Sequence, residues 1–182
     1  MVVALSLRCC AVLALLLSLP ALAQTEGRAA EIQIKAAFLY KFGGFVEWPP
    51  KAFAEHDAPF IIGVLGADIL AGELEQLVSG RTVHDRRVAV RRLRRSDSLA
   101  GLHVLFVGQS EDARLPEILQ AARGQAVLLV TESEDALAQG SMINFVTVAD
   151  KVRFDVALPP AERGQLKISS RLLGVARRVI SG

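Results

Sequence analysis

The sequence has few of the residues that build disulfide scaffolds or metal sites. Among 182 residues there are two cysteines, Cys9 and Cys10, which are adjacent. The three histidines, His56, His84 and His103, are scattered, and no two have the spacing of zinc ligands. The sequence therefore predicts neither a disulfide framework nor a structural metal site, and we expect no cofactor.

An excess of one charge is also missing. The 21 basic and 19 acidic residues give a net charge of +2, so nothing global favours nucleic acid as a partner. The mean hydropathy, +0.37, is nevertheless high for a soluble chain. Much of it comes from the N-terminus, where nearly every residue from Met1 to Ala23 is apolar.

This apolar N-terminus has the pattern of an export signal. Arg8 precedes an apolar run from Cys9 to Leu19, and Ala21-Leu22-Ala23 forms a small-x-small cleavage site before Gln24. A transmembrane anchor is the alternative, but the run is shorter than the about 20 residues that span a bilayer. We predict a cleaved signal peptide, residues 1–23, and one exported domain, residues 24–182, with no cysteine and a net charge of +1.

Strand and helix patterns alternate in the exported part. The continuous apolar run Phe60–Leu65 is typical of a strand covered on both faces, and apolar spacing predicts a helix over 31–42. Further strands are expected over 87–93, 102–107, 126–130, 142–148 and 152–158. Further helices are expected over 68–78, 113–122, 135–139 and from Ser169 or Ser170 to about Val179. This order predicts the α/β class: a single-domain, mixed, mostly parallel sheet flanked by helices, with a C-terminal β-hairpin and a closing helix.

Few residues suggest catalysis. Residues 63–68 follow a strand and open a helix, as a phosphate-binding loop would, but they lack the third glycine and the Lys-Ser/Thr pair, which favours a tight turn. Serines and histidines are scattered, so a hydrolase is the least favoured reading and we do not predict an enzyme. Seven arginines crowd into residues 81–95, which predicts a solvated strand face or a contact with an acidic partner protein.

Five aromatic residues follow one another near the start of the exported part: Phe38, Tyr40, Phe42, Phe45 and Trp48. Phe38 and Phe42 share one helical face and are expected in the core. Tyr40 and Trp48, the single tyrosine and tryptophan, carry polar groups and flank a Gly-Gly and a Pro-Pro pair. These two are candidates for the rim of a pocket.

A set of short segments occurs in a characteristic order. They are KAAFLYKF (35–42), FVEWP (45–49), IGVLG (62–66), VAVRRL (88–93), HVLFV (103–107), MINF (142–145), VRFDV (152–156) and KISSRLL (167–173). The ordered set resembles the YfiR family of exported bacterial proteins. The resemblance extends from about residue 31 to 179.

The resemblance implies a periplasmic regulator without enzymatic activity. Such a protein binds the periplasmic region of an inner-membrane signalling enzyme, a diguanylate cyclase, and represses it, so that it controls cyclic di-GMP and biofilm formation. An outer-membrane lipoprotein can sequester the regulator, and family members can form homodimers. Members often have cysteine just before the HVLFV histidine, where this chain has Leu102, so the resemblance does not carry redox control over to it.

We expect a ligand or partner groove between the first helix and the last hairpin. Its candidate residues, taken from the family segments, are Tyr40, Lys41, Glu47, Trp48, Arg153, Lys167 and Ser169. Candidate contacts with a partner protein are Arg91, Arg92 and Arg94. A sensor module that binds a small periplasmic metabolite stays open as the alternative, because an arginine such as Arg153 can bind a carboxylate or phosphate through two hydrogen bonds.

Overall fold

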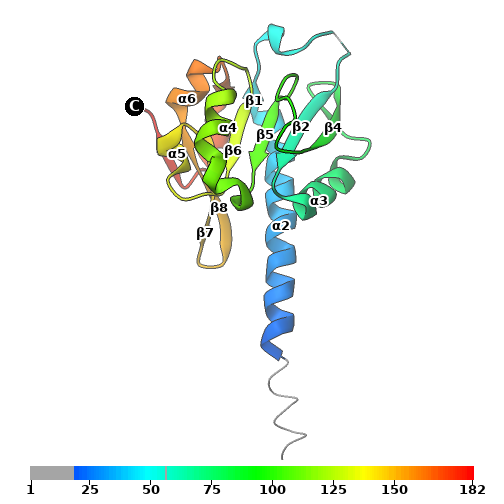
Figure 1. Ribbon diagram of the computed structural model, residues 1–182, viewed down its shortest axis with the longest axis vertical. Coiled ribbons are helices and arrows are strands. Elements are labelled where there is room, and N and C mark those ends of the chain that lie inside the picture. Colours follow the sequence, from blue (N-terminus) through cyan, green and yellow to red (C-terminus); the bar gives the residue numbers. More distant parts are fainter. Residues whose placement is uncertain (1–18, 56) are drawn as a thin grey trace, which may run out of the picture.

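The chain forms one α/β domain, with helices on both faces of an eight-stranded sheet (Figure 1). The structure, a computed structural model, describes residues 19–55 and 57–182. The helices are α2 (Leu19–Phe45), α3 (Asp68–Val78), α4 (Leu115–Ala121), α5 (Ala136–Gln139), α6 (Leu158–Arg163) and α7 (Ser170–Leu173), with 3-10 turns η1 (Pro50–Ala52) and η2 (Gln109–Arg114). The predicted signal peptide falls outside the described residues up to position 18.

The sheet is mostly parallel, as predicted. Its strands are β2 (Phe60–Leu65), β3 (Thr82–Val83), β4 (Arg86–Leu93), β5 (Val104–Val107), β6 (Leu128–Thr131), β7 (Ile143–Val148), β8 (Lys151–Ala157) and β10 (Arg178–Ile180). They lie in the order β10-β8-β7-β6-β5-β2-β4-β3. The predicted hairpin is β7 and β8, which pair antiparallel, and β3 also pairs antiparallel with β4. A separate two-stranded sheet joins β1 (Val46–Glu47) to β9 (Lys167–Ile168).

The first helix, α2, is longer than the predicted helix over 31–42. It continues to Phe45, because Gly43 remains helical and lets the helix approach β2: a Cβ there would lie 3.2 Å from Phe60 and Val83. Phe42 is fully buried and packs against Phe154 of the hairpin, with ring centroids 5.1 Å apart. The prediction that this aromatic face belongs to the core is therefore confirmed.

The C-terminal region differs in detail from the expected closing helix. That helix is the single turn α7, and Val179 lies instead in β10, which pairs parallel with β8. Helix α6 was not expected, because two prolines follow Leu158. Proline is tolerated in the first turn of a helix, where its missing N–H has no partner in any case. The start of the predicted helix over 113–122 is the 3-10 turn η2.

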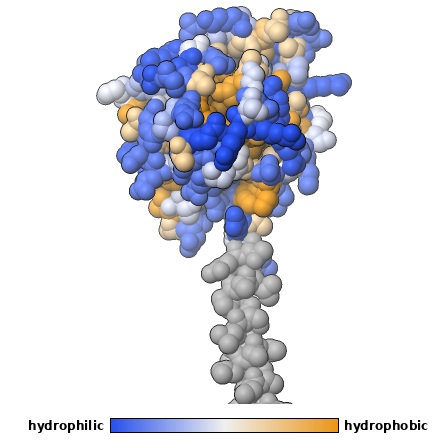
Figure 2. Space-filling view, viewed as in Figure 1, coloured by the Kyte–Doolittle hydropathy of each residue, from blue (hydrophilic) through white to orange (hydrophobic). Residues whose placement is uncertain are grey.

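Two elements extend beyond the body of the domain. The N-terminal half of α2 and the tip of the β7–β8 hairpin project from the same end of the molecule (Figure 1). No helix in the described ranges is both long enough and apolar enough to cross a membrane. The face of the body seen in Figure 2 is mainly hydrophilic, with apolar patches between the polar side chains.

Candidate functional site

Three of the predicted groove residues meet where β1 pairs with β9. Glu47 lies opposite Lys167 in the antiparallel pair, and the Ser169 backbone N–H donates to the Phe45 carbonyl at 2.9 Å. Ser169 also accepts a hydrogen bond from the Leu172 N–H at 3.4 Å through its hydroxyl. This two-stranded contact therefore fastens the end of α2 to the segment before α7.

The aromatic and basic candidates on α2 lie elsewhere. Tyr40 donates its hydroxyl to the Thr82 carbonyl at 3.2 Å, beneath the guanidinium of Arg81 at 5.3 Å. Tyr40 thus faces β3 and not the hairpin. Lys41 is exposed to solvent. The structure does not bring either residue to the Glu47–Lys167 contact.

Trp48 belongs to a second cluster, formed with histidines and phenylalanines below the start of β2 and β5. Its indole N–H donates to the His103 carbonyl at 3.1 Å, and its ring meets Phe60 edge-on at 5.0 Å. His103 stacks on Phe53 at 4.4 Å and on Phe60 at 4.9 Å. The cluster closes the amino end of these two strands. It was not predicted from the sequence, which placed Trp48 at the rim of a groove between the first helix and the last hairpin.

His103 is held in its neutral form. Its Nδ1 accepts a hydrogen bond from the Ile61 N–H at 3.0 Å, which leaves the proton on Nε2. In the described part of the chain no acceptor lies within 3.5 Å of Nε2 in hydrogen-bonding geometry, and the Ala52 carbonyl acts on it only weakly. Burial lowers the pKa of His103 to about 4; the Ala52 carbonyl opposes this change and the charge of Arg86 adds to it. The one lone pair of the neutral imidazole is taken up by the Ile61 N–H, and the stacked ring therefore contributes to packing.

A cleft of about 1050 Å³ opens on the face of the sheet away from α2. Its floor is formed by β7 and β8, where Asn144 and Asp155 are opposite one another and both are more than nine-tenths buried. Its walls come from α4, α5, α6 and β10. Arg153, two residues before Asp155 on β8, points to the same face of the sheet but does not line the cleft.

Some polar groups of the cleft are paired within the chain, and others are left without a hydrogen-bond partner among the residues that the structure describes. The Asp155 carboxylate accepts from Arg177, at 2.7 Å from Nε, and contacts Arg178 at 3.3 Å, and this pairing raises the pKa of Arg177. Asn144 accepts from the Thr131 hydroxyl at 2.6 Å, and its amide N–H groups make no hydrogen bond within the described ranges. Arg123 and Arg163 add exposed positive charge at the walls. The lining also holds Glu134 and Asp135, so four arginines face three carboxylates and the excess charge is a single positive one. The cleft therefore offers hydrogen-bond donors and a slight positive charge to a small anionic molecule with an apolar part.

This cleft was not predicted from the sequence, although an asparagine and an aspartate inside apolar strands could have indicated it. Asn144 interrupts the apolar segment 142–146, and Asp155 interrupts 152–158. A buried carboxylate in a strand needs a cationic partner, but the sequence does not reveal that Arg177 supplies it from the next strand.

The carboxyl end of the parallel strands is closed by the protein itself. A Cβ on Gly108 would lie 2.6 Å from the Gly66 carbonyl oxygen, and one on Gly66 would lie 2.5 Å from the Ser110 hydroxyl. Ser110 donates to the Gly66 carbonyl at 2.8 Å, and Glu111 is buried beside it. No room is left for a phosphate at this turn, which agrees with the tight turn favoured for residues 63–68.

A buried ion pair network joins α2 to the end of β6. Lys35 donates to Glu31 at 2.5 Å and to Glu132 at 2.6 Å, and Glu132 also accepts from the Gln109 N–H at 3.2 Å. Burial alone would lower the pKa of Lys35, but the two carboxylates outweigh it and raise the pKa. The described residues contain no cluster of three or more histidine, cysteine, aspartate or glutamate side chains that could hold a metal ion.

Two of the three arginines expected to contact a partner are already engaged within the chain. Arg91 donates to the carbonyls of Ser98 and Ala100 at 2.9 and 3.2 Å, and so holds the loop after β4. Arg92 forms two hydrogen bonds with Glu75 of α3, at 2.9 and 2.8 Å, which lowers the pKa of that carboxyl. Arg94 is exposed.

Comparison with known proteins gives one family. The sequence model described as YfiR/HmsC-like (DUF4154) matches residues 32–177. No curated protein matches the chain. Among solved structures, an ABC domain in complex with L-Trp from Streptococcus pneumonia is similar with a TM-score of 0.48 and 12% sequence identity; the match covers 66% of this chain and 55% of that one. Because the family match spans most of the chain, from α2 to Arg177, this protein belongs to the YfiR/HmsC-like family.

Proposed function

We propose that this chain is a periplasmic regulatory protein that binds and represses a membrane-bound diguanylate cyclase, and so lowers cyclic di-GMP. The family match over residues 32–177 carries the proposal. The partner is the periplasmic region of the inner-membrane enzyme. An outer-membrane lipoprotein that sequesters the regulator, and a homodimer as the acting form, belong to the same proposal.

The arrangement of the described residues supports regulation by binding. Buried polar groups such as Lys35, His103 and Asp155 are engaged in packing or ion pairs that fasten elements together. Arg91 and Arg92 likewise secure the loop and helix beside β4. These contacts support a structural role for the groups, and the proposal assigns recognition of the partner to the surface of the domain.

Deletion of the gene tests the proposal directly. Cyclic di-GMP and biofilm formation should rise in the deletion strain and return to the original level when the full chain is restored. A chain that lacks residues 1–23 should fail to restore them, because it stays in the cytoplasm. Unchanged cyclic di-GMP on deletion would contradict the cyclase as target, and a membrane pull-down with residues 24–182 would then identify the partner.

The cleft over Asn144 favours a second candidate function, a sensor of a small periplasmic anion. A ligand at 100 times its dissociation constant should add about 2.7 kcal/mol to the free energy of unfolding, which a thermal-shift screen of metabolites detects. Val146→Trp should project a bulky ring into the cleft beside Asn144 and weaken or abolish the shift. Thr147→Trp, the next residue on the opposite face of β7, is the matched control. No shift with any carboxylate or phosphate compound would count against this candidate.

A further inference from the structure

Strand β4 has an outer edge that is largely unpaired. On its inner side, residues 88–93 pair with residues 60–65 of β2. On its outer side it pairs only with the two residues of β3, through Arg86 and Arg87, and the Val88 N–H reaches the Arg81 carbonyl at 3.1 Å. Beyond this point β4 continues to Leu93, and no strand within residues 19–55 and 57–182 lies beside it.

The direction of the free backbone groups follows from the alternation along a strand. Because the Val88 N–H points outward, the N–H and C=O groups of Val90 and Arg92 point outward as well, whereas those of Ala89 and Arg91 face β2. Val90 is half-buried and Arg92 exposed, so the edge is open to solvent. An edge with such groups is a template for an added strand.

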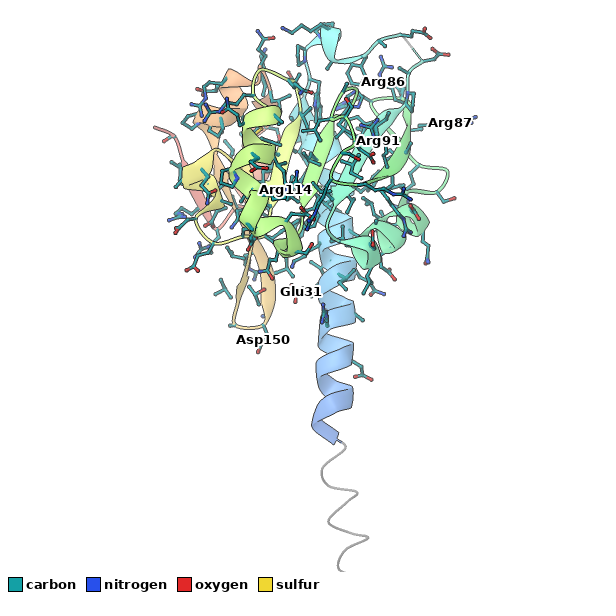
Figure 3. All side chains as sticks on the ribbon, in the orientation of Figure 1. Glu31, Arg86, Arg87, Arg91, Arg114 and Asp150 are labelled. Carbon is teal, nitrogen blue, oxygen red and sulfur yellow. The ribbon has the colours of Figure 1, made fainter. Side chains whose placement is uncertain are left out.

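The charges along this edge decide which strand it accepts. Arg87 and Arg94 are exposed at its two ends. Arg95, which follows, is already paired with Glu111 at 3.3 Å. In Figure 3, Arg87 points away from the body beyond β4. A second copy of β4 would place arginine near arginine, which is unfavourable, whereas glutamate or aspartate would be attracted. The edge therefore selects against its own copy and in favour of an acidic segment.

We propose that the outer edge of β4 binds an extended, acidic segment of the partner protein as an additional strand. The backbone groups of Val90 and Arg92 form the ladder, and Arg87 and Arg94 attract the carboxylates. The identification of that partner as the regulated membrane enzyme rests on the proposed function above. The strand-binding edge itself is a property of this chain and can be tested without the enzyme.

A synthetic peptide provides the first test. The probe is a capped octapeptide in which valine or threonine alternates with glutamate, and its control has lysine at each glutamate. With the acidic peptide in excess, amide exchange at Val90 and Arg92 should slow by about tenfold or more, and this protection should weaken at high salt. Absence of protection at millimolar peptide, or equal protection by the lysine peptide, would overturn the proposal.

Variants separate the backbone contribution from the charge contribution. Val90→Pro removes an outward N–H group but no hydrogen bond to β2. In this variant the peptide should no longer slow amide exchange at Arg92, whereas the amides of β2 should stay protected. If this variant does not fold, the double variant Arg87→Glu/Arg94→Glu replaces it and should lose binding at least about tenfold. Lys151→Glu/Arg171→Glu makes the same charge change at exposed sites elsewhere and should bind as the unmodified chain does.

The same variants distinguish this inference from the proposed function. In the deletion strain, Arg87→Glu/Arg94→Glu should fail to restore low cyclic di-GMP, and Lys151→Glu/Arg171→Glu should restore it. If both restore it, the cyclase is regulated through another surface and the β4 edge is not the docking site. If deletion itself leaves cyclic di-GMP unchanged, the proposed function fails, while the peptide result still decides the inference.

Discussion

At the scale of single residues, His103 makes the stability of the domain depend on pH. In the unfolded chain the imidazole takes up a proton below about pH 6.5. In the folded domain it stays neutral down to about pH 4. The unfolded chain thus binds more protons in this window, and the free energy of unfolding should fall as pH drops from 6.5 to 4, by roughly 3 kcal/mol in all. Urea denaturation across this range measures it.

A variant isolates the contribution of this histidine from that of the carboxylates. His103→Gln has no titrating group at this position, so its stability should depend less on pH between 6.5 and 4 than that of the unmodified chain. The variant is expected to be less stable at neutral pH, but this does not affect the comparison, because only the slope of the free energy of unfolding against pH is compared. Parallel pH profiles would show that the His103 pKa is not depressed in the folded state.

Lys35 should be costly to remove because it is the shared cation of two carboxylates. In Lys35→Met the Glu132 carboxylate, 17% exposed, loses its charge partner, and we expect a loss of about 2–4 kcal/mol in the free energy of unfolding at pH 7. Glu31→Gln removes the more exposed carboxylate and should cost at most about 1 kcal/mol. Equal losses in the two variants would contradict this view of the network.

Individual residues were predicted well where apolar spacing decides their place, and poorly where a distant partner does. Phe42 was correctly placed in the core by its position on the helix. Tyr40 lies on another face of the same helix and donates a hydrogen bond to Thr82, which is 42 residues further along the chain. No local pattern predicts such a contact. Of the seven residues expected to line one groove, three, Glu47, Lys167 and Ser169, lie together where β1 pairs with β9, and their role in binding stays a prediction.

At the scale of elements, α7 depends on its N-terminal cap. The Ser169 hydroxyl accepts from the Leu172 N–H, whereas Ser170 lies inside the helix and is exposed. We expect Ser169→Ala to lower the free energy of unfolding by about 1 kcal/mol and Ser170→Ala to change it by less than about 0.5 kcal/mol. Chemical denaturation of both variants measures this, and the reverse order would assign the cap to Ser170.

The contact between the turns after β2 and β5 should tolerate no added carbon. Gly108→Ala places a Cβ against the backbone of Gly66, so the turns must separate, at a cost of about 2 kcal/mol or more. Gly44→Ala is the matched control, because nothing lies within 4 Å of its Cβ position in α2. There the helix should gain up to about 1 kcal/mol. Thermal unfolding of both variants measures the two changes in stability. An increase in the stability of Gly108→Ala would contradict the tight contact between the turns.

The elements that sequence reasoning missed share one physical cause. α6, β9 and β10 are short, and short elements carry too few residues to show a period. β10 was expected as the end of a helix because Val175, Ala176 and Val179 suit a helical face. Its pairing with β8, which also carries Arg177 to Asp155, is a tertiary contact that overrides this local preference.

At the scale of the whole molecule, the exported form should contain no thiol. Protein isolated from the periplasm should have the mass of residues 24–182, and a thiol assay under denaturing conditions should find no reactive group, because Cys9 and Cys10 leave with the signal peptide. A chain that keeps its leader would instead show two thiols. The midpoint of urea unfolding should likewise be the same with and without reductant.

The projecting helix also determines how the molecule should be handled. From Gln24 to Phe45, α2 extends about 33 Å at 1.5 Å per residue, and its first turns stand clear of the body. An affinity tag or sensor-chip anchor before Gln24 therefore leaves both sheet edges and the cleft accessible. A tag after Gly182 would instead follow β10 by two residues, beside the mouth of the cleft. Attachment through the N-terminus is thus the orientation in which partner and metabolite binding can be compared on one immobilised sample.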